Sequence, residues 1–258
     1  MARQLAIIPL CWREAEWMEG SRGSEIVAGR VMVIAAHPDD AEIQCGGTVA
    51  KMIRAGSAVS YVLCTSGNRG SDDPTVSAEQ LAVVREGEQR AAARQLGVGR
   101  VTFLRHDDGD LEVARPLLRE QLTRLLREER PEAVFTHDFL AGLASYEVCY
   151  LHPDHRAAGA AAFEAAFFCA PGPLFYPEQL AEGLRPHRVE AMYLFMSDRP
   201  DCHVDISVTL EAKVRAIAGH ASQWGGQPDI AGFFGDMARR LGQERGLPLA
   251  EAFKVLRP

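Results

Sequence analysis

Short apolar runs alternate with longer amphipathic stretches along most of the chain. Four apolar runs are short enough for strands buried on both faces: 31–36, 58–65, 101–104 and 132–136. The intervening stretches 42–55, 77–96 and 117–129 have helical spacing, and Pro153 begins a further helix that we expect to reach about Phe168. This alternation predicts an α/β fold with an open, mostly parallel, Rossmann-like sheet flanked by helices.

The second half of the chain has a weaker pattern. We expect strands at 187–195 and 203–207, a helix at 209–220 with Lys213 on its polar face, and a helical tail after Ile230. Three long stretches, 66–75, 137–151 and 170–186, lack a regular pattern, and such loops are usually functional or mobile. We therefore predict a single domain over residues 30–258, preceded by a peripheral extension over residues 1–29.

Composition and charge exclude several classes of protein. The chain has 258 residues, and its 47% hydrophobic and 24% charged content rules out a disordered or fibrous chain. Its 28 Lys and Arg against 35 Asp and Glu give a net charge of −7, which argues against nucleic acid as a partner. No segment approaches the roughly 20 apolar residues of a membrane-spanning helix, so we expect no membrane partner.

Cysteine usage and the N-terminal segment favour a reduced compartment. No two of the cysteines lie within a short ligand spacing, and a chain of this size does not need disulfides. Pro9, Arg13 and Glu14 interrupt the apolar run near the N-terminus, so we expect no secretory signal. The sequence therefore predicts a cytoplasmic protein.

The strongest chemical signal lies where the first predicted strand ends, in the run Ala-His-Pro-Asp-Asp-Ala-Glu at 36–42. His37 and Asp40 could bind one metal ion, because imidazole nitrogen and carboxylate oxygen are both good zinc donors. Asp39 lies between them and could face a metal-bound water. The alternative is an acidic turn that only caps the helix starting near Glu42, because short motifs match by chance.

A second cluster lies between an irregular stretch and a predicted helix, in the run Tyr-Leu-His-Pro-Asp-His at 150–155. His152 and His155 flank Pro153-Asp154, and the cluster follows the fourth predicted strand. Both clusters would lie at the carboxyl ends of parallel strands, so they can converge on one site. The sequence therefore predicts a metal site.

Two classes of enzyme bind a metal through two histidines and one carboxylate and leave coordination positions open for water or substrate. Hydrolytic zinc sites have such ligands, and so do non-haem iron oxygenases. Hydrolysis explains the remaining residues better, because Asp39 can act as general base on a metal-activated water. One histidine of the second pair can then act as general acid, oriented by Asp154.

With these motifs in place, the chain resembles the LmbE-like (PIG-L) family of zinc-dependent de-N-acetylases. The resemblance spans about residues 31–223 and rests on motifs that occur together in one order. After the HPDD run come Gly-Gly-Thr at 46–48, Thr-Ser-Gly-Asn-Arg-Gly at 65–70, Arg85 with Glu88, Asp-Gly at 108–109, His-Pro-Asp-His at 152–155, Val-Asp-Ile-Ser at 204–207 and His-Ala-Ser-Gln at 220–223.

The resemblance implies a fold, a cofactor and a role for each matching residue. It identifies His37, Asp40 and His155 as ligands of Zn²⁺. It also makes Asp39 the general base, His152 the catalytic histidine and Asp154 the carboxylate that orients His152.

Three further residues match the family's substrate contacts. Tyr150 matches a tyrosine near the acetyl oxygen, and Arg85 and Asp108 match positions that contact sugar hydroxyls. The residues alone also allow plainer interpretations. Arg85 could pair with Glu88 on a solvated helix face, and Asp108 could belong to an ordinary turn.

Other polar residues have plain interpretations as well. The loop 65–70 could bind an anion through its backbone or act as a lid. His137-Asp138 is more typical of a surface loop than of a pocket wall. The run 220–223, with Trp224, fits packing or the end of a helix.

The leading hypothesis is a zinc-dependent hydrolase that removes acetyl from an N-acetylglucosamine-type small molecule, and we expect it to form a homo-oligomer. One alternative keeps the metal site but changes the substrate to another N-acyl amine or a conjugated amide. The other alternative is a non-catalytic α/β binding module. The chain has no glycine-rich dinucleotide motif after the first strand, which argues against a nucleotide-binding module.

Overall fold

A single mixed sheet of seven strands organises the chain. The computed structural model describes residues 23–142 and 152–258. Within them the strand order is β3-β2-β1-β4-β5-β7-β6, with these bounds: β1 Arg30–Ala35, β2 Ala58–Thr65, β3 Arg100–His106, β4 Ala133–His137, β5 Ala191–Phe195, β6 Cys202–Asp205 and β7 Ala250–Leu256. The first five strands are parallel, whereas β7 runs antiparallel to both of its neighbours. The predicted α/β fold with a mostly parallel sheet is confirmed.

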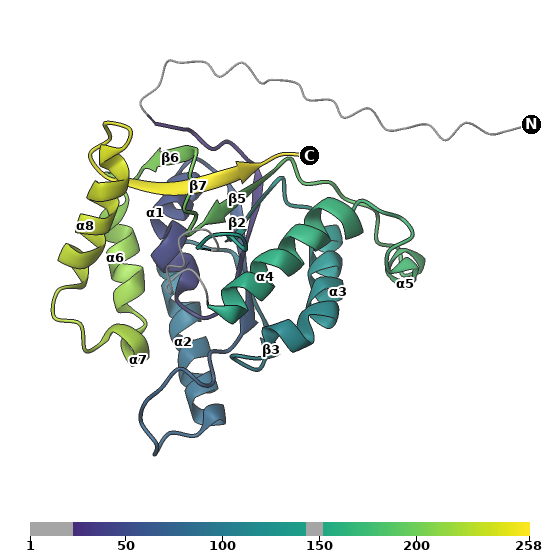
Figure 1. The fold of residues 1–258 in the computed structure, drawn as a ribbon, viewed down its shortest axis with the longest axis horizontal. Coiled ribbons are helices and arrows are strands. Elements are labelled where there is room, and N and C mark those ends of the chain that lie inside the picture. The colour runs from purple at the N-terminus through teal and green to yellow at the C-terminus, as the bar shows by residue number, and fades with distance from the viewer. Residues whose placement is uncertain (1–22, 143–151) are drawn as a thin grey trace, which may run out of the picture.

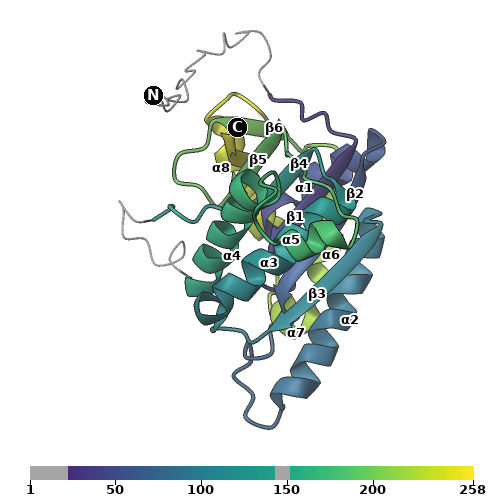
Figure 2. The same ribbon diagram turned by 90° about the vertical axis from the view of Figure 1, so that its right-hand side faces the viewer.

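Helices cover both faces of the sheet (Figure 1). Their bounds are α1 Asp40–Arg54, α2 Ala78–Leu96, α3 Leu111–Glu129, α4 Pro153–Glu164, α5 Pro177–Ala181, α6 Leu210–Ala218, α7 Ala221–Trp224 and α8 Ile230–Gln243, and a π-helical turn at Ala165–Cys169 continues α4. Figure 2 shows α3, α4 and α5 in front of the sheet. None of the helices in the described part of the chain combines the length and apolar character that crossing a bilayer requires.

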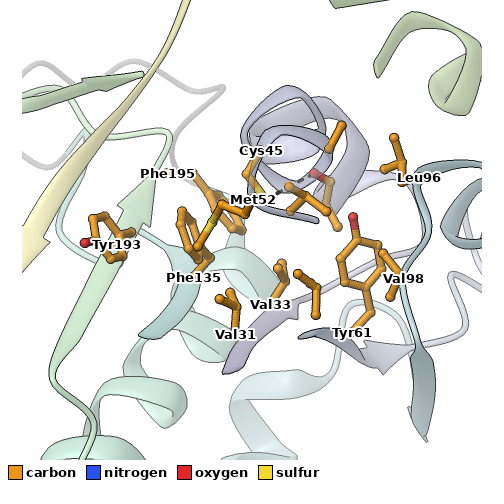
Figure 3. Close-up of a cluster of buried hydrophobic side chains, with 14 of the residues drawn as sticks. Val31, Val33, Cys45, Met52, Tyr61, Leu96, Val98, Phe135, Tyr193 and Phe195 are labelled. Carbon is orange, nitrogen blue, oxygen red and sulfur yellow. Dashed lines mark hydrogen bonds between the residues drawn. The ribbon is translucent and has the colours of Figure 1, made fainter. Parts of the chain in front are cut away.

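The alternation of side chains along β1 divides the core in two. Val31, Val33 and Ala35 face one cluster, which packs against α1, α2, α6 and α8 (Figure 3). Met32 and Ile34 face the other cluster, which packs against α3 and α4. Because successive side chains of a strand point to opposite faces, a strand covered on both sides must be apolar throughout, as this one is.

The end of the chain differs from the predicted helical tail. Helix α8 begins at the expected residue, but the chain then returns as β7 and pairs with β5 and β6. Phe253 and Val255 belong to one core cluster and Leu256 packs on the other, so the segment has the period of a strand. Glu251 and Lys254 obscure that period in the sequence. Helix α3 also begins six residues earlier than predicted, at Leu111, and includes Pro116.

A buried ion pair joins β7 to two helices. Lys213 of α6 is only 1% exposed, so its expected place on a polar face is wrong; its Nζ donates to Glu251 Oε1 over 2.7 Å. The two oxygens of Glu251 also accept the backbone N–H groups of Gly47 and Thr48 in α1. A side chain at position 47 would meet Ile206 at 2.9 Å, which explains the glycine. The C-terminal strand therefore supports α1.

Arg127 organises the stretch after the π-helical turn. Its buried guanidinium donates to the side chain of Gln179 and to five backbone carbonyls, those of Cys169, Ala170, Gly172, Phe175 and Tyr176. Buried carbonyl groups need such donors, since an unpaired one costs free energy. This requirement explains how the stretch 170–186, predicted to be irregular, is nevertheless held in place and contains α5.

We predict that Arg127→Met lowers the free energy of unfolding by about 3 kcal/mol, because several buried carbonyls lose their donor. Arg124→Met on the same helix is the control. Arg124 forms only an exposed ion pair with Glu182, so that variant should lose less than about 1 kcal/mol. Urea denaturation measures both, and equal losses in the two variants would contradict the proposed role of Arg127.

Candidate metal centre

The candidate site lies at the carboxyl ends of β1 and β4, the neighbouring strands where the order of the sheet reverses. Open α/β sheets bind ligands at this position, because the adjacent loops leave the edge in opposite directions. The loop after β1 carries His37 and Asp39 and leads into α1 at Asp40. His137 ends β4, and His152 precedes α4. The two sequence motifs therefore meet at one edge of the sheet.

Three imidazoles surround the buried carboxylate of Asp40. His155 Nε2 lies 3.3 Å from Asp40 Oδ1, whereas His137 Nε2 and His37 Nδ1 lie 3.3 Å and 3.5 Å from Asp40 Oδ2. Burial would raise the pKa of Asp40, but the neighbouring His155 holds that pKa well below its usual value. Asp40 is therefore an anion among nitrogen donors.

The groups around Asp40 fit a divalent metal ion. Within residues 23–142 and 152–258, donor atoms of His37, His152 and His155 lie within 4.8 Å of one another, as do those of Asp40, His137 and His155. Imidazole nitrogen and carboxylate oxygen are the donors that suit zinc. Among the residues that the structure describes, the buried Nδ1 of His155 has no hydrogen-bond partner, so this ring remains available to a ligand.

His137 lies in the site, although the sequence favours a surface loop for His137-Asp138. That expectation is wrong, because the two residues are only 1% and 8% exposed. His137 Nε2 accepts the backbone N–H of Ala36 over 3.1 Å, so its lone pair is already used. Burial lowers the pKa of His137 to about 4, which keeps the ring neutral. His137 is therefore less suited to bind an ion than His37 or His155.

The carboxylate of Asp154 contacts His37. The resemblance had implied that this carboxylate orients His152 instead. Asp154 Oδ2 lies 3.1 Å from His37 Nε2, and the backbone N–H groups of Gly109 and Leu111 donate to the same carboxylate. Although burial would raise the pKa of Asp154, these hydrogen bonds lower it to about 2. The carboxylate is buried beneath His37, whereas His152 lies at the exposed start of α4.

Asp108 contacts the same nitrogen of His37, with Oδ1 3.1 Å from Nε2. Burial opposes a charge on His37, but Asp108, Asp154 and Asp40 outweigh it and raise the pKa of His37 well above its usual value. Carboxylates on Nε2 orient the ring so that Nδ1 faces Asp40, as is common for metal-binding histidines. The turn around Asp108 is thus part of the site.

Asp39 adopts a backbone conformation that is rare for a residue with a side chain. Its φ of 98° lies in the left-handed region, and such conformations cluster at functional sites where neighbours over-determine them. Gln89 Oε1 accepts its backbone N–H over 2.9 Å, and Trp224 Nε1 donates to its Oδ2 over 3.1 Å. Burial and the charge of Asp40 raise the pKa of Asp39 to about 6, against the opposing charge of Arg85.

Arg85 lies inside the site and not on a solvated helix face. It is 4% exposed, its Nη2 donates to the carbonyl of Pro38 over 2.7 Å, and the same nitrogen lies 3.6 Å from Asp39 Oδ1. The loop 65–70 wraps this guanidinium: a side chain at Gly67 or Gly70 would lie 2.4 Å from Arg85 Nη1. The glycines of this loop therefore make room for Arg85.

His152 occupies the exposed side of the cluster. Its ring centroid lies 4.8 Å from that of His37 and 4.7 Å from that of His155. His152 Nδ1 accepts the backbone N–H of Asp154 over 3.2 Å, so its other nitrogen, Nε2, carries the proton of the neutral ring. Burial and the two neighbouring imidazoles lower its pKa. Tyr150, the remaining predicted residue, lies outside the described residues.

Three residues of the site escape prediction from the sequence. His137 had a usable signal, since it ends an apolar strand at the same edge as His37 does. Gln89 lies in a helix rich in Arg and Glu, where nothing distinguishes it. Trp224 lies 185 positions from Asp39, and no local pattern connects the two. Only the folded chain brings these side chains to Asp39.

Comparison with known proteins places this geometry in context. The family model described as GlcNAc-PI de-N-acetylase, PIG-L, matches residues 32–166. The diacetylchitobiose deacetylase of Thermococcus kodakarensis is 37% identical over 76% of this chain and 70% of its own length. The 1D-myo-inositol 2-acetamido-2-deoxy-alpha-D-glucopyranoside deacetylase of Mycobacteroides abscessus is 32% identical over 75% of this chain and 81% of its own.

A solved structure with the same fold supports the comparison. The N,N'-diacetylchitobiose deacetylase of Pyrococcus horikoshii superposes with a TM-score of 0.80 at 33% sequence identity. The match covers 89% of this chain and 84% of that one.

We predict that Asp154→Asn weakens binding of a divalent ion about 10- to 100-fold, because His37 loses the carboxylate that orients it. Asp138→Asn is the matched control, since within residues 23–142 and 152–258 the contact of the Asp138 carboxylate is the nearby N–H of Leu140. Competition with a chromophoric chelator measures both affinities. An unchanged affinity in Asp154→Asn would show that its contact with His37 does not support metal binding.

Proposed function

The chain belongs to the PIG-L (LmbE-like) family of de-N-acetylases, and on that premise we propose that it is a metal-dependent hydrolase that removes acetyl from an N-acetylglucosamine-type substrate. One observation carries the proposal. Asp39, a carboxylate whose pKa burial and Asp40 raise to about 6, lies beside a buried cluster of imidazoles and carboxylate that fits a divalent ion. Hydrolysis of an amide needs this pairing of a proton acceptor with an electrophilic centre.

Zinc is the ion that we propose, with His37, Asp40 and His155 as its ligands. Asp40 contacts both imidazoles, and the Nδ1 of His37 faces Asp40 because its Nε2 is held by Asp154. His137 is left out, since Ala36 already donates to its Nε2. When bound, the ion would polarise the acetamide carbonyl and lower the pKa of a water molecule.

Asp39 is the group that we assign to proton transfer. It accepts a proton from the attacking water and returns it to the nitrogen of the leaving amine, so that acetate and a free amine are formed. A general base works best with a pKa near the operating pH, and burial beside Asp40 raises the pKa of Asp39 toward that range. An amine leaves poorly unless it is protonated, so the same group serves both halves of the reaction.

His152 is assigned to the developing oxyanion. Because Nδ1 accepts the N–H of Asp154, the neutral ring carries its proton on Nε2, which is a donor. A fixed donor at that position stabilises negative charge on the carbonyl oxygen. Asp154 thus acts on two histidines, through its backbone N–H on His152 and through its carboxylate on His37.

Three substrate contacts stay predictions. Tyr150 is proposed to lie near the acetyl oxygen, and Arg85 and Asp108 to contact sugar hydroxyls. Asp108 is the better supported of the last two. Its carboxylate borders His37, whereas its contacts with Asn68 Oδ1 and Arg69 use its backbone N–H and carbonyl. Arg85, in contrast, is enclosed by Gly67, Pro38 and Asp39.

Compartment and assembly belong to the same proposal. We propose a cytoplasmic enzyme, supported by the free, buried state of Cys45, Cys64, Cys169 and Cys202 among the described cysteines. We also propose a homo-oligomer, in which exposed apolar side chains such as Phe168 and Leu174 would be covered.

An amine-release assay tests the function. The zinc-loaded protein is expected to release amine from N-acetylglucosamine, N,N'-diacetylchitobiose or an N-acetylglucosaminyl inositol, and a chelator should abolish turnover until zinc is restored. Zinc binding without turnover on any of these sugars would favour another N-acyl amine as substrate. Absence of both zinc binding and turnover would contradict the proposal.

We predict that Asp39→Asn lowers kcat about 100- to 10,000-fold, because the amide cannot accept the proton. The bound metal should stay at the wild-type level, since Asp39 is not among the proposed ligands. Asp107→Asn is the control: Asp107 lies on the exposed turn beside Asp108 and contacts Asn68 and Arg69. Wild-type kcat in metal-loaded Asp39→Asn would remove Asp39 from the mechanism.

A further inference from the structure

The short helix α7 contacts three elements that build the site. His220, which precedes it, lies 3.3 Å from Glu42 Oε2 in α1. The backbone N–H and the hydroxyl of Ser222 donate to Glu88 in α2. Gln223 Nε2 donates to the carbonyl of Gly70, in the loop around Arg85. The polar residues of this segment therefore attach it to the walls of the site.

The last residue of α7, Trp224, reaches the proposed base itself. Its Nε1 donates to Asp39 Oδ2 over 3.1 Å. An indole N–H is a donor only, so it cannot take up the proton that Asp39 handles. The contact occupies Oδ2, whereas Oδ1 lies 3.6 Å from Arg85 Nη2 and stays available for the proton. An indole in this position orients a base without competing for its proton.

The ring of Trp224 is itself fixed by packing. Its centroid lies 5.1 Å from that of Phe234 and 6.4 Å from that of Phe233, both in α8. Its backbone N–H donates to the carbonyl of His220 over 2.8 Å. Because packing already restricts the rotamers of Trp224, its hydrogen bond costs little conformational entropy. It therefore restricts the Asp39 carboxylate more than a mobile polar side chain would.

The backbone of Asp39 explains why such restriction matters. Gln89 holds the N–H of Asp39, and Arg85 holds the carbonyl of Pro38 just before it. Both contacts act on the main chain, which lies in the left-handed region at Asp39. Among the contacts of the described residues, the short hydrogen bond to the Asp39 carboxylate comes from Trp224, whereas Arg85 Nη2 stays 3.6 Å away.

We propose that Trp224 is a positioning residue, whose indole N–H orients the Asp39 carboxylate for proton transfer. The inference rests on the proposed function, since it assigns Trp224 to the base of that reaction. Trp224 acts through its contact with Asp39, so it governs the rate of the chemical step and not the binding of substrate.

Trp224→Phe tests the proposal, because phenylalanine keeps an aromatic ring against Phe234 and removes the N–H. We expect kcat to fall about 10- to 100-fold, as for a misoriented base, with KM within threefold and zinc content unchanged. Ser222→Ala is the matched control from the same helix: it loses the hydroxyl contact with Glu88, keeps the backbone one and does not touch Asp39, so kcat should stay within twofold.

The outcomes separate this proposal from the function on which it rests. Wild-type protein and Asp39→Asn are assayed first on the same substrate. If Asp39→Asn is inactive while Trp224→Phe keeps wild-type kcat, the proposed function stands and the role of Trp224 is wrong. Equal losses in Trp224→Phe and Ser222→Ala would also overturn it, because α7 would then act only as general support.

A second variant covers the case in which Trp224→Phe unfolds. In a chain carrying Trp12→Phe and Trp17→Phe, the remaining tryptophan can be replaced by its benzothiophene analogue, which has sulfur in place of the N–H. Shape is retained while the donor is lost. A fall in kcat of about 10-fold or more at an unchanged melting temperature supports the proposal, and an unchanged kcat overturns it.

Discussion

The buried charge of Asp40 is the constraint on which the site depends. A carboxylate in the interior is costly unless positive or hydrogen-bonding groups surround it, and here the imidazoles of His37 and His155 and the backbone N–H of His37 do so. Those rings need partners in turn, which Asp154 and Asp108 supply to His37. The cluster thus consists of alternating acids and imidazoles, an arrangement that also provides the donors for a divalent ion.

The C-terminal half of the chain contacts the elements that carry this cluster and helps to hold them in place. Strand β7 carries Glu251, which binds backbone N–H groups of α1 and the buried Lys213. Helix α7 attaches to α1, α2 and the loop around Arg85. Because α1 begins at Asp40, these contacts hold the helix whose first turn forms the site. Segments that look peripheral in the sequence therefore contribute to the rigidity of the centre.

Family resemblance and contact geometry contribute different information. Resemblance correctly pointed to a de-N-acetylase, because several motifs occur together in one order. It does not specify which atom of a residue meets which neighbour. The carboxylate of Asp154 lies on His37 and only its backbone N–H reaches His152, and the glycines at 67 and 70 enclose a guanidinium. These details follow from packing, which a motif does not record.

The sequence by itself determined the α/β class, most helices and strands, and the two motifs that meet at the sheet edge. Those features depend on local periodicity and on residues a few positions apart, so a single chain carries them. Only the tertiary structure decided that β7 is a strand, that Lys213 and His137 are buried, and that Trp224 contacts Asp39. Each of these depends on groups separated by tens to hundreds of residues, whose burial and hydrogen bonding exist only once the chain has folded.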